Sequence, residues 1–492
     1  MKIANKLTIL LFFTAAVTSS CKKEVLDINT DPNNPTTSVA TAELVLPSAL
    51  STTAAIMNNP TADARFAFAG IWMGHIGFSG NYAIATESLS YNITTNFASG
   101  AFGNLFDNIN DYDFVESKGI QQGSKFYEAV GKLMKAYCFQ TLVDLYGNIP
   151  YSEALKGTVV SRPKYDDAKA VYESLGQKMD TSISLLKTLS DNGATILGDI
   201  MFKGDASKWL QFANTVKLRL LMRQSERADR QPYIQTEKAK FSATTAFLTT
   251  NAAVNPGYLN STGKTNPFWG SNVNVSGTYT QDFYRAGQYA ISFFQNNNDP
   301  RVARYYKPIA GSSSVYQGNY FGDQGMVNSK TSEIGTGVLK SYDQASILML
   351  AAESYFIQSE AVLRGWIAGD AKTLYQKGVE ASFTYLGLTA ANAQAYYTQA
   401  GNNQVNWDAA ASMPDKIALI IRQKWAAEPF INELEPYNEY RRLKLPADVP
   451  LSRSQYSTGK LPGRLLYPQR EYDVNATNVP TAAATDKVWW MP

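Results

Sequence analysis

Two adjacent helical segments between Ser346 and Leu386 limit most strongly what this chain can fold into. The first reads SILMLAAESYFIQSEAVLRGW, the second reads AKTLYQKGVEASFTYL, and a turn at Gly369–Asp370 separates them. Apolar residues recur in both at the spacing of an α-helix. The first segment has small residues where a second helix could approach closely, at Ala351, Ala352, Ser354 and Ala361. The pattern predicts a helix hairpin.

Similar helical periodicity occurs elsewhere in the chain. The apolar residues of two further segments repeat at steps of three or four: Phe126, Val130, Leu133 and Tyr137 in one, Trp209, Phe212, Val216 and Leu220 in the other. Three basic residues of the latter segment, Lys217, Arg219 and Arg223, are expected on its solvated face. A last helical segment, DKIALIIRQKWAAEPFINELEPYNEYRRLKLP, contains Pro429 and Pro436 and must be kinked or broken.

The hairpin at 346–386 resembles a tetratricopeptide repeat, with Tyr375 to Ala381 in its second helix. No strict repeat period recurs along the chain, so any other repeats must be diverged. Repetitive helical folds can exceed the usual size of one domain, because each unit packs only on its neighbours. We therefore expect a mainly α fold, built as a single helical domain over residues 41–492.

One part of this domain differs from the rest in composition. Eleven of the 33 glycines lie between Asn255 and Ala345, together with many Asn, Ser and aromatic residues. We interpret residues 255–345 as a loop-rich insert. Long loops in a compact protein are usually functional, so this insert is expected to contribute to a binding face.

The amino-terminal segment has the organisation of a secretory signal peptide. Lys2 and Lys6 precede an apolar run from Leu7 to Val17, which is too short for a permanent membrane span. Two small serines then precede Cys21, and this arrangement resembles a bacterial lipobox, although Thr18 replaces its usual leucine. We predict a signal peptide at residues 1–20, lipid attachment at Cys21 and a tether at residues 21–40. An ordinary signal peptide with a cysteine nearby is the alternative.

Charge and rare residues exclude several functional classes. Without residues 1–20 the net charge is about +1, which argues against nucleic acid as the main partner. His75 is the only histidine, so zinc sites built from several histidines are excluded. With Cys21 lipidated, Cys138 has no partner for an intrachain disulfide. We expect no catalytic motif, no metal site and no cofactor. A structural calcium ion at Asn296 to Asp299 is an alternative to a capped turn there, and the turn is favoured.

Two stretches combine aromatic residues with glycines and amides in a way that suits ligand binding. AGIWMGHIGFSGNYA contains Trp72, His75 and Tyr82, and NPFWGSNVNVSGTY contains Phe268, Trp269, Asn272 and Tyr279. Aromatic faces can stack on the apolar faces of sugar rings, and amides both donate and accept hydrogen bonds. The alternative is that these residues fill a core. The core is favoured for Trp72 and a structural role for His75, whereas both interpretations of Trp269 stay open.

Seven sequence motifs, which occur in a fixed order along the chain, together resemble those of a known protein family. They are the lipobox with its DINTDPNNPT tether, LVDLYGNIPYSEA, WLQFANTVKLRLLMR, NDPR, LAAESYFIQSEAVLRG, IIRQKWAAEPFINELEPYNEYRR and RLLYPQREYDVN. The chain resembles the SusD/RagB family of outer-membrane lipoproteins, and most closely its SusD-like subgroup. The resemblance implies a SusD-like helical fold with four tetratricopeptide-like units and a loop-built face. It also implies a SusC-like TonB-dependent β-barrel transporter as partner and an oligosaccharide or peptide as ligand.

The resemblance further implies an outer-membrane location, with a lipid anchor as the only contact with the membrane. The anchor is expected to face the cell exterior. Lys22 and Lys23 precede Glu24, whereas exported members often carry acidic residues first, so an anchor facing the periplasm stays an alternative.

Three functions follow from these observations. The first is a non-enzymatic protein that captures glycans or peptides for import. The second is a surface glycoside hydrolase, which needs two carboxylates at a defined separation. The third is a structural lipoprotein without a soluble ligand. For the first function, truncation of residues 266–279 is expected to weaken binding with little change in melting temperature.

Overall fold

The computed structural model describes residues 40–58, 66–83, 86–189, 196–323 and 325–492. The predicted signal peptide, the lipid-attachment residue Cys21 and the tether up to residue 39 lie outside the described residues. Helices dominate, as predicted. The helices are α2 (Ala42–Met57), α3 (Ala67–Trp72), α4 (Thr86–Ser90), α5 (Gly100–Gln121), α6 (Lys125–Tyr146), α7 (Ala168–Lys187), α8 (Ala206–Met222), α9 (Gln231–Lys238), α10 (Pro267–Gly270), α11 (Gln288–Asn296), α12 (Val302–Tyr305), α13 (Ala351–Leu363), α14 (Ala371–Tyr385), α15 (Ala390–Tyr397), α16 (Met413–Ala427), α17 (Leu434–Leu443) and α18 (Gln469–Asn475).

The strands in the described part of the chain are short and pair in twos. They are β1 (Ile76–Phe78), β2 (Ile149–Pro150), β3 (Tyr165–Asp166), β4 (Ala252–Val254), β5 (Tyr284–Ala286) and β6 (Ser346–Met349). The antiparallel pairs are β1 with β5, β2 with β3, and β4 with β6. Across these described ranges, no helix has both the length and the apolar character needed to cross a membrane.

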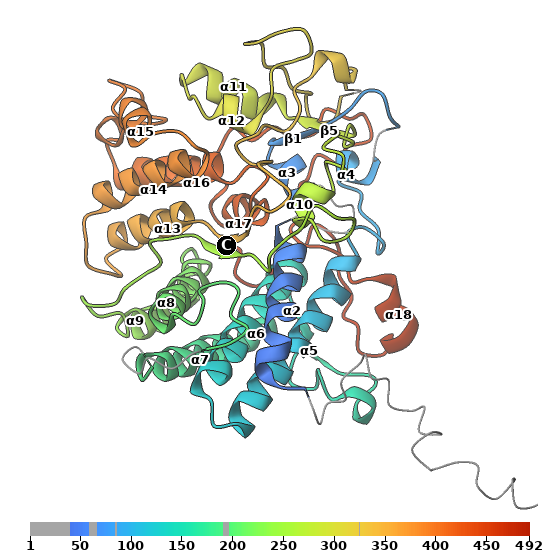
Figure 1. The fold of residues 1–492 in the computed structure, drawn as a ribbon, viewed down its shortest axis with the longest axis vertical. Coiled ribbons are helices and arrows are strands. Elements are labelled where there is room, and N and C mark those ends of the chain that lie inside the picture. Colours follow the sequence, from blue (N-terminus) through green and yellow to red (C-terminus); the bar gives the residue numbers. More distant parts are fainter. Residues whose placement is uncertain (1–39, 59–65, 84–85, 190–195, 324) are drawn as a thin grey trace, which may run out of the picture.

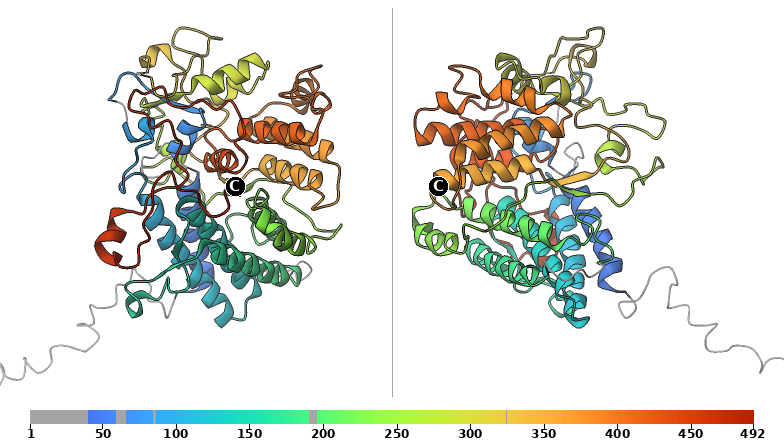
Figure 2. Two further views of the ribbon diagram at one scale, coloured as in Figure 1. Left: turned by 180° about the vertical axis from the view of Figure 1, so that it is seen from behind. Right: turned by 60° about the vertical axis from the view of Figure 1, so that its left-hand side comes forward.

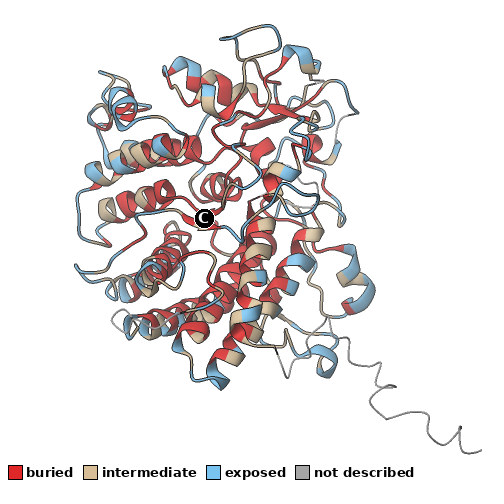
Figure 3. Cartoon of the chain, in the orientation of Figure 1, coloured by how far each residue is buried: buried red, intermediate tan, exposed pale blue. Residues whose placement is uncertain are grey.

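Consecutive long helices pack against one another and form a layered body. Helix α5 packs on α6, α6 on α7, α7 on α8, and α13 on both α14 and α16. Figures 1 and 2 show these layers, with α5 to α8 on one side and α13, α14 and α16 on the other. Burial follows the layers, because the faces between them are buried and the outer faces are exposed (Figure 3). The prediction of a mainly α fold made of helix pairs is confirmed.

The helix hairpin predicted at 346–386 forms, with one difference at its start. Helices α13 and α14 lie where the periodicity predicts them, and the carboxylate of Asp370 accepts the N–H of Thr373 to cap α14. Ser346–Met349, however, forms strand β6 rather than the first turn of the helix. Its apolar side chains are buried on both sides, and β4 supplies its pairing partner. A short apolar run of this kind has no periodicity that separates strand from helix.

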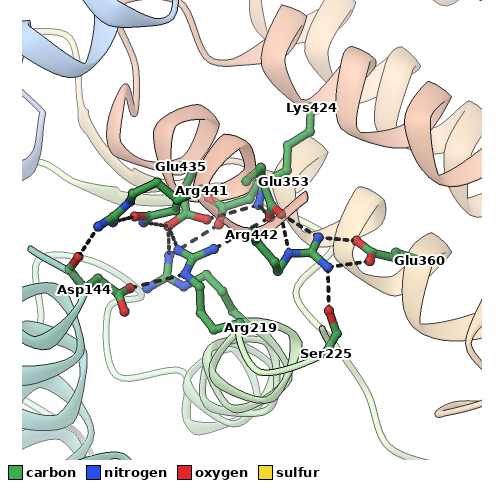
Figure 4. Close-up of polar contacts among 12 residues, drawn as sticks. Asp144, Arg219, Ser225, Glu353, Glu360, Lys424, Glu435, Arg441 and Arg442 are labelled. Carbon is green, nitrogen blue, oxygen red and sulfur yellow. Dashed lines mark hydrogen bonds and ion pairs between the residues drawn. The ribbon is translucent and has the colours of Figure 1, made fainter. Parts of the chain in front are cut away.

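The basic residues of α8 are buried, so the prediction that they lie at the surface is wrong. Lys217, Arg219 and Arg223 are each at most 4% exposed. Arg219 Nη1 lies 3.3 Å from a carboxylate oxygen of Glu353, and Arg223 pairs with Glu435. Arg219 and Arg223 belong to a charge network between the two groups of helices (Figure 4), whereas Lys217 pairs with Asp180 and Glu237. The carboxylates around the two arginines come from α6, α13 and α17, and the periodicity of α8 alone could not reveal them.

The last helical segment is broken, as its prolines predict. Helix α16 ends at Ala427, and α17 begins at Leu434 after Pro429 has interrupted the pattern. Pro436 lies within the first turn of α17, where its missing N–H costs no helical hydrogen bond. Arg442 of α17 donates to both oxygens of Glu360 on α13, at 2.7 Å each. Arg442 also pairs with Glu439 on its own helix, so it joins α17 to α13 in a buried ion network.

Candidate functional site

A cleft of about 650 Å³ lies beside the small sheet formed by β1 and β5. Its walls come from α3, β1, α4, β5 and the loops that carry Asn96–Ala98 and Gln281–Phe283. Figure 1 shows these elements together, above the ends of α2 and α5. The volume falls within the range of about 300–1,000 Å³ that is usual for small-molecule sites.

The β1–β5 pair forms one rigid side of the cleft. Its antiparallel register places Phe78 opposite Tyr284, and both residues line the cleft. The Ser79 N–H extends the pairing, because it donates to the carbonyl oxygen of Phe283 at 2.8 Å. Two segments far apart in sequence are thereby held together at the site.

Aromatic rings form the apolar part of the cleft. Phe97 and Phe283 are half-buried, so part of each ring faces solvent. The Phe283 ring packs edge-on against Phe78, with ring centroids 5.2 Å apart, and against Tyr82, with centroids 5.7 Å apart. Tyr82 is 41% exposed. The rings thus combine a packed inner edge with an accessible outer face.

Polar groups of the cleft lie beside these rings. Asn96 is exposed, and Glu87 and Gln281 are half-buried. One oxygen of Glu87 accepts the Thr94 N–H at 2.8 Å, and the side-chain Oε1 of Gln281 accepts the Phe283 N–H at 2.8 Å. These bonds fix both side chains within their loops. An amide nitrogen and a carboxylate oxygen can still face a ligand.

Of the candidate ligand-binding residues predicted in the stretch AGIWMGHIGFSGNYA, Trp72 and His75 are buried and Tyr82 is exposed. Trp72 is fully buried, stacks on Phe97 at 5.9 Å and donates its indole N–H to the carbonyl oxygen of Ser88 at 3.0 Å. His75 is also fully buried, and its Nδ1 lies 2.6 Å from Glu433 Oε2. Trp72 and His75 therefore occupy the core positions that the alternative interpretation favours. Tyr82 lies at the edge of the cleft.

The candidate residues predicted in the stretch NPFWGSNVNVSGTY lie outside this cleft. Phe268 and Asn272 are buried, and the Asn272 amide donates to the carbonyl oxygen of Phe268 at 2.7 Å. Trp269 and Tyr279 are half-buried, and Lys307 Nζ lies 4.9 Å from the centroid of the Tyr279 ring. The structure therefore does not place the candidate residues of the two stretches in one binding surface. Ligand contact by Trp269 or Tyr279 stays a prediction.

Sequence reasoning missed most of the residues that line the cleft. Phe97, Glu87 and Asn96 follow directly after the glycine-rich stretch, in TESLSYNITTNFASG, and Gln281 and Phe283 follow Tyr279. Both stretches combine aromatic residues with amides, so the signal used for the predicted residues was present there too. What was absent from the sequence was the pairing of β1 with β5 that brings the stretches together.

A second cleft, of about 410 Å³, lies between α16 and the segments around Ala410 and Pro446. Small and polar residues line it, including Ala409, Ala411 and Gln404, and no aromatic ring is among its described lining residues. A saccharide would find no stacking surface there. The cleft beside β1 and β5 is therefore the better candidate for a sugar site.

In the oxygen-rich turn at 296–299, the carboxylate of Asp299 is bonded to Arg301. Asp299 accepts the backbone N–H of Arg301 at 3.0 Å and forms an ion pair with the Arg301 guanidinium at 2.7 Å. Both residues are fully enclosed. The Asp299 oxygens therefore hold a cation of the protein itself, and the arrangement does not suit a calcium ion.

Comparisons with known proteins agree with this architecture. The sequence profile of the SusD-like family, described as starch-binding and associating with the outer membrane, matches residues 32–468. A search of curated protein sequences gives no match. Proteins of this family are ligand-binding proteins associated with the outer membrane.

Solved structures extend the similarity to the whole fold. A SusD-like protein from Bacteroides thetaiotaomicron is 25% identical, with a TM-score of 0.74 over 92% of this chain and 98% of that one. A chitin-binding protein is 26% identical, with a TM-score of 0.73 over 91% of this chain and 100% of that one. A chitin-binding SusD homologue from Flavobacterium johnsoniae is 23% identical, with a TM-score of 0.75 over 90% and 98% of the two chains. The chain belongs to the SusD/RagB family.

Proposed function

We propose that the protein captures oligosaccharides in the cleft beside β1 and β5 and delivers them to a SusC-like TonB-dependent transporter. The observation that carries this proposal is the grouping of the half-exposed rings of Phe97, Phe283 and Tyr82 with the side chains of Asn96 and Gln281. Sugar rings offer apolar faces for stacking and hydroxyl groups for hydrogen bonding. The chitin-binding relative supports a carbohydrate rather than a peptide.

The cleft is better suited to binding than to hydrolysis. A glycoside hydrolase places two carboxyl groups on either side of the bond that it breaks. Among the described residues that line the cleft, Glu87 is the only acid. We therefore propose a binding protein without turnover, and incubation with oligosaccharides should release no new reducing ends. Release at enzymatic rates would favour the glycosidase alternative.

The binding proposal is tested by removing single rings. Phe97→Ala and Phe283→Ala should each weaken saccharide binding about 2- to 10-fold, because an aromatic contact contributes about 0.5–1.5 kcal/mol. Phe114→Ala is the matched control, since Phe114 is a half-buried phenylalanine on α5, away from the cleft. Isothermal titration with a panel of oligosaccharides measures the affinity. Unchanged binding in both cleft variants would refute the site.

The membrane anchor and the partner complete the proposal. We propose a lipid at Cys21 that holds the protein to the outer membrane with the cleft facing the cell exterior. Several acyl chains are needed for firm anchoring, because each buried CH₂ contributes about 0.8 kcal/mol. Mass spectrometry of the native amino terminus tests the lipid, and protease accessibility on intact cells tests the orientation. Purification from native membranes in mild detergent should recover a large β-barrel protein.

A further inference from the structure

The carboxyl-terminal residues lie at the interface between the two groups of helices, although they form neither a helix nor a strand. Figures 1 and 2 show the carboxyl terminus between α8 and α13. Trp490 is fully buried, and Val488 and Met491 are at most 5% exposed. Residues 485–487 are exposed, so the chain enters the interface only with its last few residues.

Trp490 contacts three helices of the charge network. Its indole N–H donates to the carboxylate of Asp144 on α6 at 2.8 Å. The guanidinium carbon of Arg441, on α17, lies 4.9 Å from the centroid of the Trp490 ring, and that of Arg223, on α8, lies 5.9 Å from it. Both distances are within about 6 Å, the range of a cation–π contact. Trp490 therefore contacts α6 and α8 in one group of helices, and also α17, which packs on α16 of the other group.

The buried charge of Arg441 depends in part on this tryptophan. Among the residues that the structure describes, no carboxylate forms an ion pair with Arg441. Its guanidinium donates instead to the carbonyl oxygens of Asp144 and Gly463, at 2.7 and 2.8 Å, and packs against the rings of Tyr437 and Trp490. Burial lowers the pKa of the guanidinium. A buried cation without an ion pair is stabilised only by such neighbours, so loss of the Trp490 ring would weaken the interface at a charged position.

The contacts of Trp490 join parts of the chain that are far apart in sequence. Asp144 precedes Trp490 by 346 positions, and the contact exists only when α6, α8 and α17 are already in place. Closing so long a loop costs entropy before the contact is gained, so distant contacts form after local helix pairs. We propose that residues 488–491 are a strap, which closes the interface between the two groups of helices last during folding and opens first during unfolding.

The test compares two tryptophans that differ in how far away their partners lie. Trp209 on α8 is also fully buried, and its indole N–H also donates to a carboxylate at 2.8 Å, but that carboxylate belongs to Asp199, only 10 positions away. Trp490→Ala and the matched control Trp209→Ala are made in the full chain. Unfolding and refolding rates are then measured in denaturant by far-ultraviolet circular dichroism.

Trp490→Ala should raise the unfolding rate about 100-fold or more and leave the refolding rate within about 2-fold of the wild type, because a contact absent from the transition state affects only unfolding. Trp209→Ala should slow refolding, because its contacts are local and form early. Trp490→Phe keeps a ring and loses the indole N–H, so it should raise the unfolding rate less. Slower refolding of Trp490→Ala than of Trp209→Ala, or an unfolding rate that Trp490→Ala leaves unchanged, would overturn the inference.

A second measurement does not depend on refolding. A protease recognition sequence inserted between the exposed residues Ala476 and Thr477 allows the tail of the folded protein to be cut. The cut tail should dissociate while the helical circular dichroism of the body persists, and a synthetic peptide of residues 477–492 should bind again. The same peptide with Trp490→Ala should bind at least about 10-fold more weakly, because a buried tryptophan is a typical centre of binding energy. Loss of the helical signal together with the tail would overturn the inference, and so would equal binding of the two peptides.

Discussion

Replacement of Arg442 by methionine should destabilise the protein by removing one cation from the buried charge network. The Arg442 side chain is fully buried and donates to Glu360 at 2.7 Å, to Glu439 at 2.7 Å and to Ser225 at 2.8 Å (Figure 4). Methionine fills most of the space but leaves the two carboxylates with less positive charge. Breaking a buried pair from one side costs about 3–5 kcal/mol. The lower value is expected, because Arg364 remains near Glu360.

The pKa of Glu439 gives an independent value of similar size for the free energy that these ion pairs contribute to folding. Burial alone would raise this pKa, but Arg442, Lys424 and Arg223 outweigh burial and lower it to about 2. An unfolded glutamate has a pKa of about 4.3, and one pKa unit corresponds to 1.36 kcal/mol, so the ionised group contributes roughly 3 kcal/mol at neutral pH. Because the folded-state pKa is the lower one, this stability is present above about pH 4.3 and is lost as the pH falls toward 2.

Thermal unfolding between pH 7 and pH 3 measures both effects. For 492 residues the entropy of unfolding is about 1 kcal/mol per kelvin, so a loss of about 3 kcal/mol lowers the melting temperature by about 3 °C. This difference between wild type and Arg442→Met should narrow below about pH 4, since the wild type loses the same interaction there.

The matched control is Arg227→Met. Arg227 forms its ion pair with Asp229 at the surface, at 2.8 Å, and such pairs contribute at most about 1 kcal/mol. If Arg442→Met were no less stable than this control, the network would not stabilise the fold as argued. A difference between Arg442→Met and wild type that stayed constant down to pH 3 would show that lost packing, rather than lost charge, is responsible.

Three further predictions concern single buried or crowded positions. Phe268→Ala should lower the free energy of unfolding by about 3–5 kcal/mol in denaturant titrations, because Phe268 is buried. Truncation of 266–279 should therefore lower the melting temperature, contrary to the expectation from sequence. Gly80→Ala should lower the free energy of unfolding by about 1–3 kcal/mol in the same assay, because the new Cβ would lie 1.8 Å from a backbone oxygen. Gly103→Ala, at an open position of α5, should instead raise it by about 0.5–1 kcal/mol. Equal effects of the two substitutions would contradict the packing argument. Burial raises the pKa of the Cys138 thiol to about 12. In a Cys21→Ser variant, a thiol reagent at pH 8 should therefore label Cys138 in the unfolded chain and not in the native chain. Labelling of the native chain would refute the burial of Cys138.

The helices could be predicted from the sequence because their information is local. Apolar residues at helical spacing locate α6, α8, α13 and α14 within a few residues, and the prolines of the last segment locate the break between α16 and α17. Local patterns fail where a distant partner decides the outcome. The basic side chains of α8 look like a solvated face, yet the carboxylates of Asp144, Glu353 and Glu435 surround two of them.

The candidate site was harder to predict for the same reason. Trp72 and His75 stand in a stretch that suits ligand binding, but neighbours from elsewhere in the chain cover both side chains. The accessible rings, Phe97 and Phe283, stand in stretches with a similar composition. Which aromatic residue of a glycine-rich stretch faces outward depends on the strand register and on the helices behind it, and neither can be seen in the spacing of the residues.

The buried residues beneath the cleft join it to the charged core of the molecule. The Trp425 indole N–H donates to the carbonyl oxygen of Met73 at 2.9 Å, and Glu433 holds His75 at 2.6 Å. Trp425 follows Lys424 of the charge network on α16, and Glu433 directly precedes α17. The inner wall of the cleft is therefore fixed to the least exposed part of the fold, while Tyr82 and Phe283 lie on loops at its edge. In the proposed binding role, a wall fixed before binding spares the protein the entropy of ordering it, and loops at the edge can adjust to the bound sugar.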